Sequence, residues 1–316
     1  MDRPLTQAQE RLHEKYERLI AAAQRLPPVT VAVVHPCDGV SLQGAIEAHK
    51  LGLIAPILVG PPARIQSVAD RLGIDISALP LIASAHSHDS ATKAVALVRA
   101  AKAQALMKGS LHTDEVMGAV VAHDTGIRTE RRISHCFVMD VPGHEDPLII
   151  TDAAVNIVPT LEDKVDIVQN AIDLAHAMRL PEIRVAILSA METVNPKVPS
   201  TIEAAALCKM ADRGQITGAI LDGPLALDNA INLEAAAIKN IVSPVAGRAN
   251  VLVVPDLVAG NILAKSLSFL AGADSAGIVL GARVPIILTS RADSLPSRLA
   301  SCAVAALLAA AQRGAA

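Results

Sequence analysis

The chain has 316 residues, enough for two domains or one large domain with a full hydrophobic core. The formal net charge is −3 and aromatic residues make up 1%, so the sequence offers neither a basic surface nor stacking platforms for nucleic acid. The most apolar run, CAVAALLAAA, is about half as long as a membrane span. The charged N-terminal segment has no signal-peptide features, and the four cysteines are scattered without CxxC spacing. We therefore expect a cytoplasmic protein with reduced thiols and no membrane or nucleic-acid partner.

Short apolar runs alternate along the chain with amphipathic stretches of helical length. The predicted strands cover 30–35, 56–60, 80–84, 105–109, 135–141, 147–155, 184–190, 218–223, 250–256, 276–281 and 284–290. The predicted helices cover 41–52, 89–103, 161–179, 200–213, 228–239 and 258–271. This alternation is typical of an α/β protein with mostly parallel sheets. The exception is PGHED, which has a strand on each side and no helix; it predicts a hairpin, with a domain boundary near 135–145.

Ligands of parallel sheets gather at the carboxyl ends of the strands, and several predicted strands here end in polar residues. In ALMKGSLHTDEVM, Lys108 can neutralise a phosphate, Gly109 lets the backbone approach it closely, and Ser110 follows. The alternative is an exposed lysine beside an ordinary turn. The chain contains neither a P-loop motif nor a GxGxxG fingerprint.

Two further strand ends carry candidate residues. Asp256 ends one strand, and Gly260-Asn261 lie inside the following helix, where glycine indicates close contact either with a ligand or with a neighbouring element. In VPIILTSRADS, Ser290 and Arg291 precede a helix N-terminus, which favours an anion site. The alternative is that Asp293 or Ser294 only caps that helix.

Metal ligands are not expected. His86 and His88 have HxH spacing but lie in a polar turn, and His144, Glu145 and Asp146 are typical of a solvated hairpin tip.

Six blocks of the chain, in order, resemble the phosphate acetyltransferase/phosphate butyryltransferase family. They are MKGSLHTDEVM, TDAAVNIVPTLEDK, LSAMETVNPKVPST, LDGPLALDNAI, VPDLVAGNILAK and ILTSRADS. The resemblance implies two α/β domains with mostly parallel sheets and an interdomain cleft, as in isocitrate and isopropylmalate dehydrogenases. It implies that 1–140 plus 296–316 form the first domain, closed by the C-terminal helix, and that 141–295 form the second. It also implies a homodimer without metal or permanent cofactor.

The family moves an acyl group between coenzyme A and inorganic phosphate, giving acyl phosphate and CoA. The resemblance implies that Ser290 stabilises the transition state and Arg291 binds phosphate, whereas Lys108, Gly109, Ser110, Asp256, Gly260 and Asn261 contribute to phosphate or CoA binding. Acetyl-specific relatives have an aspartate base six residues after the arginine; here this residue is Ser297, so the nearby Asp293 is the candidate catalytic base, with a water or another residue as the alternative. An arginine after the KG turn is also missing, and Arg128 is its candidate replacement.

The acyl preference, acetyl or butyryl, stays open at this point. Two other functions are also considered: an NAD(P)-dependent dehydrogenase of the same fold, and a non-catalytic CoA-sensing domain. The dehydrogenase requires a set of metal-binding side chains that the sequence does not offer, and retention of Ser290-Arg291 argues against the sensor.

Overall fold

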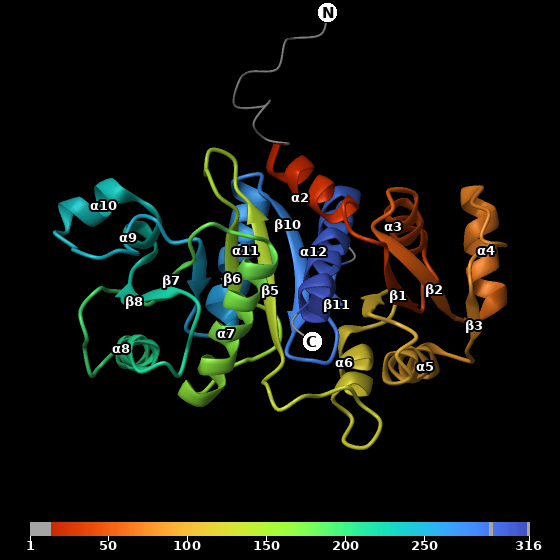
Figure 1. Ribbon diagram of the computed structural model, residues 1–316, viewed down its shortest axis with the longest axis horizontal. Helices are drawn as coiled ribbons and strands as arrows, with labels where there is room; N and C mark the ends of the chain where they lie inside the picture. The colour runs from red at the N-terminus through yellow and green to blue at the C-terminus, as the bar shows by residue number, and fades with distance from the viewer. Residues whose placement is uncertain (1–13, 291–292, 315–316) are drawn as a thin grey trace, which may run out of the picture. The chain divides into compact units, whose positions relative to one another are not determined.

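The computed structural model describes residues 14–290 and 293–314, and the chain divides into two compact units. Among the described residues, unit 1 contains those up to Lys15 together with Arg132–Ser275, and unit 2 contains Tyr16–Arg131 and those from Ala276 onward. The predicted domain boundaries stay a prediction; Figure 1 labels the helices and strands of both units.

Unit 2 is built on a mostly parallel sheet with the strand order β3-β2-β1-β4-β11-β10, in which only the β10–β11 pair is antiparallel. Its strands are β1 (Val29–Val34), β2 (Ile54–Gly60), β3 (Leu81–Ala83), β4 (Ala105–Lys108), β10 (Asp274–Leu280) and β11 (Ile286–Ile287). Its helices are α2 (Glu14–Gln24), α3 (Gly39–Lys50), α4 (Pro62–Leu72), α5 (Ser87–Arg99), α6 (Thr113–Val121) and α12 (Leu295–Gly314). The central strands are buried on both faces, which explains their continuous Val, Ile and Leu composition.

The order of the strands in unit 2 reverses between β1 and β4. The chain runs from β1 outward through β2 to β3, and α5 then carries it back to β4 on the other side of β1. Strand–helix–strand connections between parallel strands are right-handed. Connections that run in opposite directions along the sheet therefore place their helices on opposite faces of it. Accordingly, α3 packs against α4 and α12, whereas α5 packs against α6 (Figure 1). The carboxyl ends of β1 and β4 are therefore a topological switch point, the usual place for a ligand.

Helix α12 is apolar over most of its length. Among the described residues it is the one helix long and apolar enough to cross a membrane, but 72% of its most apolar window is buried inside the protein. Ala, Leu and Val at 299–309 lie in the core of unit 2, so α12 packs as a core helix.

Unit 1 contains strands in the order β5-β6-β9-β7-β8. They are β5 (Ser134–Asp140), β6 (Leu148–Thr151), β7 (Arg184–Leu188), β8 (Ile220–Leu225) and β9 (Val251–Val253). The helices are α7 (Leu161–Ala177), α8 (Pro199–Asp212), α9 (Leu227–Ile231), α10 (Leu233–Ile238) and α11 (Leu257–Leu270). The β5–β6 pair is antiparallel, which confirms the predicted hairpin, and the other pairs are parallel.

The predicted α/β class with mostly parallel strands is confirmed, but some predicted elements have the wrong bounds; the strands expected over 147–155 and 250–256, for example, end at Thr151 and Val253. The helix expected over 228–239 is interrupted at Asn232, which has extended backbone angles and whose side chain accepts the Ala235 N–H at 2.9 Å. Asparagine caps a helix better than it continues one, so α10 starts anew there. The strand expected over 284–290 is reduced to Ile286–Ile287, because only these residues pair with β4 and β10.

Candidate active site

Three parallel strands of unit 2 end side by side. Val34 at the end of β1 pairs with Lys108 at the end of β4, and Met107 of β4 pairs with Ile287 of β11. The residues that follow these strands, with one residue of α12, form what we call the strand-end cluster. Its members are His35, Cys37, Lys108, Gly109, Ser110, Ser290, Asp293 and Arg298.

The end of β4 contacts the end of β1 through Lys108, Gly109 and Ser110. The side chain of Lys108 is buried, with 6% exposed, which rules out the alternative of an exposed lysine; its Nζ lies 3.4 Å from the Gly109 carbonyl oxygen. A Cβ at Gly109 would lie 2.3 Å from the Val34 carbonyl oxygen. The glycine therefore allows the β4 end to lie close to the β1 backbone. The sequence predicts instead that this close approach is to a bound phosphate. The N–H and hydroxyl of Ser110 donate to the His35 carbonyl oxygen at 3.0 and 2.9 Å.

Ser290 and Asp293 form a hydrogen-bonded turn between β11 and α12. The Asp293 carboxylate accepts the Ser290 N–H at 2.6 Å, and the Asp293 N–H donates to the Ser290 carbonyl oxygen at 3.2 Å. Ser294, not Asp293, caps α12, since its hydroxyl accepts the Ser297 N–H at 3.2 Å. Arg291 lies outside the described residues.

Arg298 is a cluster member that sequence reasoning missed. Its side chain is buried, and its guanidinium donates to the Thr289 hydroxyl at 2.8 Å and to the Ser290 carbonyl oxygen at 2.6 Å. The signal available in the sequence was an arginine directly before the long buried Ala/Leu run of α12.

Burial changes the pKa values of three titratable side chains of the cluster. Burial raises the pKa of Asp293, opposed by the Ser290 N–H and by the positive charges of Arg298 and Lys108. Burial also raises the pKa of Cys37, so this thiol stays protonated and is a poor nucleophile. Burial, together with Arg64, lowers the pKa of His35, whose Nδ1 lies 2.9 Å from the Ser90 hydroxyl oxygen. The cluster therefore combines the buried cationic side chains of Lys108 and Arg298 with one carboxyl group whose pKa is raised by burial.

Asp256, Gly260 and Asn261 form a separate group in unit 1, at the start of α11. Asp256 caps the helix by accepting the Ala259 N–H at 2.9 Å. A Cβ at Gly260 would lie 2.7 Å from the Asp152 carbonyl oxygen, and the Asn261 amide donates to the Ala153 carbonyl oxygen at 3.3 Å. These contacts favour the alternative that the glycine permits tight helix packing.

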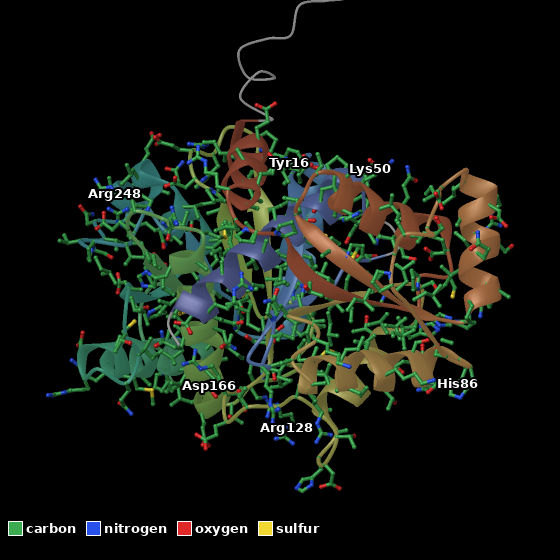
Figure 2. All side chains as sticks on the ribbon, turned by 45° about the vertical axis from the view of Figure 1, so that its right-hand side comes forward. Tyr16, Lys50, His86, Arg128, Asp166 and Arg248 are labelled. Atoms are coloured by element: carbon green, nitrogen blue, oxygen red, sulfur yellow. The ribbon has the colours of Figure 1, made fainter. Side chains whose placement is uncertain are left out.

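Arg128 is not part of the strand-end cluster. It lies on the segment between α6 and β5, where its backbone forms an antiparallel bridge with Ala282 and its side chain is exposed (Figure 2).

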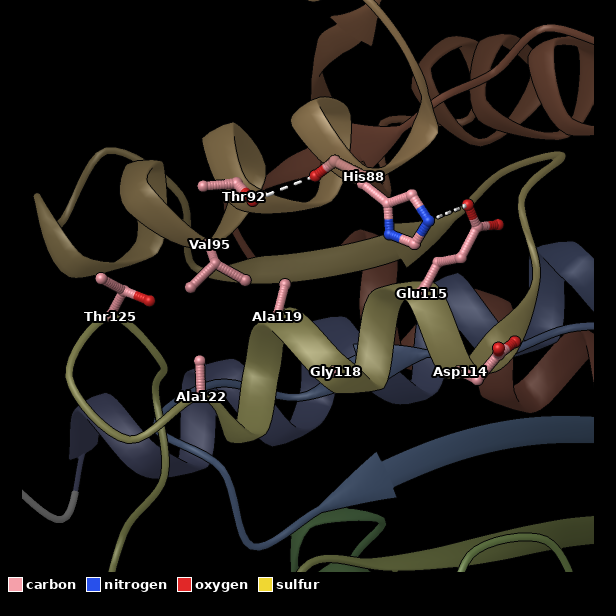
Figure 3. Close-up of a pocket in the computed structure, with 9 residues that line it drawn as sticks. All are labelled: His88, Thr92, Val95, Asp114, Glu115, Gly118, Ala119, Ala122 and Thr125. Atoms are coloured by element: carbon pink, nitrogen blue, oxygen red, sulfur yellow. Dashed lines mark hydrogen bonds and ion pairs between the residues drawn. The ribbon is translucent and has the colours of Figure 1, made fainter.

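A pocket of about 360 Å³ lies between α5 and α6 (Figure 3). Its polar end contains His88, Asp114 and Glu115, and its floor is made of small residues such as Ala119. Glu115 accepts hydrogen bonds from the Ser87 hydroxyl and the His112 N–H, which lower its pKa. Two carboxylates make this pocket unsuitable for a phosphate.

The histidine pairs singled out from the sequence have local structural roles. His86 caps α5 by accepting the Asp89 N–H at 3.2 Å, and His144 Nδ1 lies 2.9 Å from the Asp146 carbonyl oxygen. In the part of the chain that the structure describes, no group of three or more His, Cys, Asp or Glu residues is arranged to hold a metal ion.

Comparison with known proteins identifies relatives of this chain by sequence and by structure. The family model described as "Phosphate acetyl/butaryl transferase" matches residues 77–306. A phosphate acetyltransferase of Rhizobium meliloti is 66% identical over 301 residues, which cover 95% of each chain. A phosphate butyryltransferase of Clostridium acetobutylicum is 39% identical over 287 residues, 91% of this chain and 95% of the relative. The crystal structure of a branched-chain phosphotransacylase from Enterococcus faecalis superposes with a TM-score of 0.76 at 29% identity, covering 89% of this chain and 99% of that one.

The matching family model and the curated relatives make the chain an acyltransferase, and its mostly parallel α/β fold places the buried Lys108 at the switch point of unit 2. The chain belongs to the phosphate acetyl/butyryltransferase family. This confirms the resemblance inferred from the six sequence blocks. Enzymes of this family use coenzyme A as a substrate and need no permanent cofactor.

Proposed function

We propose that the chain transfers an acetyl group between coenzyme A and inorganic phosphate, with Ser290, Arg291 and Lys108 serving the reacting phosphate and carbonyl. The observation that carries this proposal is the buried Lys108 at the switch point, within electrostatic reach of Asp293 in the Ser290 turn. A buried lysine beside a helix start favours an anionic ligand. Acetyl is preferred over butyryl because the relative with 66% identity is a phosphate acetyltransferase, whereas the butyryltransferase relative is 39% identical.

The reaction makes three demands on the site. A phosphate oxygen attacks the thioester carbonyl, a C–O bond forms, and the C–S bond breaks as the electron pair leaves on sulfur. The tetrahedral oxyanion needs a hydrogen-bond donor, which we assign to the Ser290 hydroxyl. The attacking phosphate needs positive charge, which we assign to Arg291 and Lys108.

The departing sulfur takes a proton, and the reverse reaction returns it. We assign this proton to Asp293, the carboxyl group of the Ser290 turn, because burial raises its pKa and so favours the protonated form. Ser297 is not a substitute for the family aspartate: its hydroxyl is buried and accepts a hydrogen bond from the Ser294 hydroxyl at 3.1 Å.

The experiment is a kinetic series with acetyl-, propionyl- and butyryl-CoA and phosphate, following both CoA release and acyl phosphate. We expect the highest kcat/KM with acetyl-CoA. Arg291→Ala should reduce it by at least about 100-fold, in line with removal of one transition-state contact. Arg313→Ala, at the exposed end of α12, is the control and should keep full activity. CoA binding without turnover on any of the three would contradict the proposal and support a sensor.

We further propose that the protein is a cytoplasmic homodimer that contacts its second copy through α11. Val258, Ile262 and Phe269 lie on one face of this helix and are 59%, 60% and 78% exposed. Such a stripe is typical of a protein interface. Sedimentation equilibrium should give a dimer for the wild type and a monomer for Phe269→Glu, whereas Ile238→Glu, at an exposed apolar position of α10, should stay dimeric. A monomeric wild type would contradict this.

A further inference from the structure

Arg298 is an unusual residue for its place in the fold. It is 4% exposed and directly precedes the buried apolar part of α12, where Leu299 and Ala300 follow. Its aliphatic stem packs on α3, since a Cβ at Gly44 would lie 3.1 Å from Arg298 Cδ. Taking a guanidinium out of water is costly unless the charge is compensated, so a methionine would fill this space with less penalty.

The contacts of the guanidinium are all directed at one loop. Nη1 donates to the Thr289 hydroxyl at 2.8 Å, Nη2 donates to the Ser290 carbonyl oxygen at 2.6 Å, and the buried Nε has no hydrogen-bond partner. In the described part of the chain, no carboxylate forms an ion pair with it. Arg298 therefore stabilises the segment after β11 rather than its own helix.

Ser290 is held from two sides by groups of opposite charge. Its N–H donates to the Asp293 carboxylate at 2.6 Å, while its carbonyl oxygen accepts from Arg298 at the same distance. Burial lowers the pKa of the Arg298 guanidinium, and the charges of the nearby carboxylates Asp293 and Asp38 oppose this shift. The two hydrogen bonds hold both peptide groups of Ser290 and thus the position from which its Cα–Cβ bond leaves the backbone.

We propose that Arg298 is a positioning residue that orients Ser290 for the acyl transfer, an inference that rests on the proposed function. Its planar fork reaches the Thr289 hydroxyl and the Ser290 carbonyl at once, a geometry that a lysine ammonium on a flexible stem does not reproduce. Precise placement of a group at the reacting carbonyl affects the rate of the chemical step more than the binding of substrates.

The test compares Arg298→Lys, Arg298→Met and the control Arg313→Lys, an exposed arginine of the same helix. We expect kcat to fall at least tenfold in Arg298→Lys and further in Arg298→Met, with the KM values for acetyl-CoA and phosphate changed less than twofold. Arg313→Lys should match the wild type. Wild-type kcat in folded Arg298→Lys would overturn the inference, as would a tenfold rise in the KM for phosphate at unchanged kcat.

Hydrogen exchange gives a readout that does not depend on turnover. The peptide carrying Ser290 should exchange at least tenfold faster in Arg298→Met than in the wild type, while peptides from α5 stay unchanged. Unchanged protection of the Ser290 peptide would overturn the positioning role even if the enzyme is active. An inactive wild type with the expected exchange pattern would instead contradict the proposed function and leave the structural part of the inference standing.

Discussion

The close approach between β4 and β1 can be tested by adding a single methyl group at Gly109. A Cβ there would lie 2.3 Å from the Val34 carbonyl oxygen, 2.6 Å from the His35 carbonyl oxygen and 2.7 Å from the His35 carbonyl carbon. All three atoms are backbone atoms of Val34, the last residue of β1, and of His35, which follows it. No flexible side chain can therefore move aside. Gly109→Ala must therefore push the two strand ends apart.

The expected cost follows from two contributions. Overpacking of a well-packed interior costs about 1–3 kcal/mol. Displacement also weakens the two hydrogen bonds from Ser110 to the His35 carbonyl oxygen, at about 1 kcal/mol each. Together these contributions should lower the free energy of unfolding by about 3–5 kcal/mol.

Gly118 provides the matched control, because the same substitution there should have the opposite sign. It lies in α6, nine residues along the chain at an exposed position, and a Cβ would meet nothing within 4 Å. Alanine in a helix is more favourable than glycine by about 0.5–1 kcal/mol, so Gly118→Ala should be slightly stabilising.

Urea unfolding followed by far-ultraviolet circular dichroism measures both variants, since the chain has no tryptophan and one tyrosine. The reasoning is refuted if Gly109→Ala unfolds at the wild-type urea concentration, or if Gly118→Ala is destabilised as much as Gly109→Ala. Activity adds a second observable, because displacement of Ser110 should lower kcat in the first variant only.

Three further predictions concern stability in unit 1. Thr160 forms a capping box with Asp163 at the start of α7, so Thr160→Ala should lower the free energy of unfolding by about 1 kcal/mol in urea titrations, whereas Thr160→Ser should not. Asn232→Ala should cost a similar amount by loss of the α10 cap, and Asn232→Asp should retain it; equal stability of the two would contradict the capping role. Burial lowers the pKa of His135 from 6.5 to about 4, so the unfolded chain binds this proton more tightly than the folded protein. The free energy of unfolding should therefore not depend on His135 above pH 6.5, and it should decrease by up to about 3 kcal/mol as the pH falls towards 4. A His135→Gln variant whose free energy of unfolding falls just as steeply with pH would contradict this.

Much of the fold follows from local sequence patterns. Continuous apolar runs such as TVAVVH predict strands buried on both faces, and the PGHED segment predicts the β5–β6 hairpin. The interruption at Asn232 was missed because the surrounding residues are helix formers and one capping residue outweighs them. The short β11 was missed because the apolar run around it packs in the core without pairing along its full length.

The candidate site was only partly predictable, for a different reason. Lys108, Ser110 and Ser290 stand at strand ends, where their polarity is visible in the sequence. Arg298 is recognisable only through its partners, Thr289 and Ser290, since an arginine near a helix start usually lies at the surface. The sequence correctly predicts that the backbone at Gly109 approaches another group closely, but this group is the end of β1 and not a phosphate.

The most direct test of the central claim is the phosphate dependence of CoA release from acetyl-CoA by the wild-type enzyme. The account predicts no release without phosphate and, with phosphate present, one acetyl phosphate formed for each CoA released. The proposed transfer to a phosphate bound at the strand-end cluster would be contradicted by CoA release that continues without phosphate, which indicates hydrolysis, or by no release in either condition.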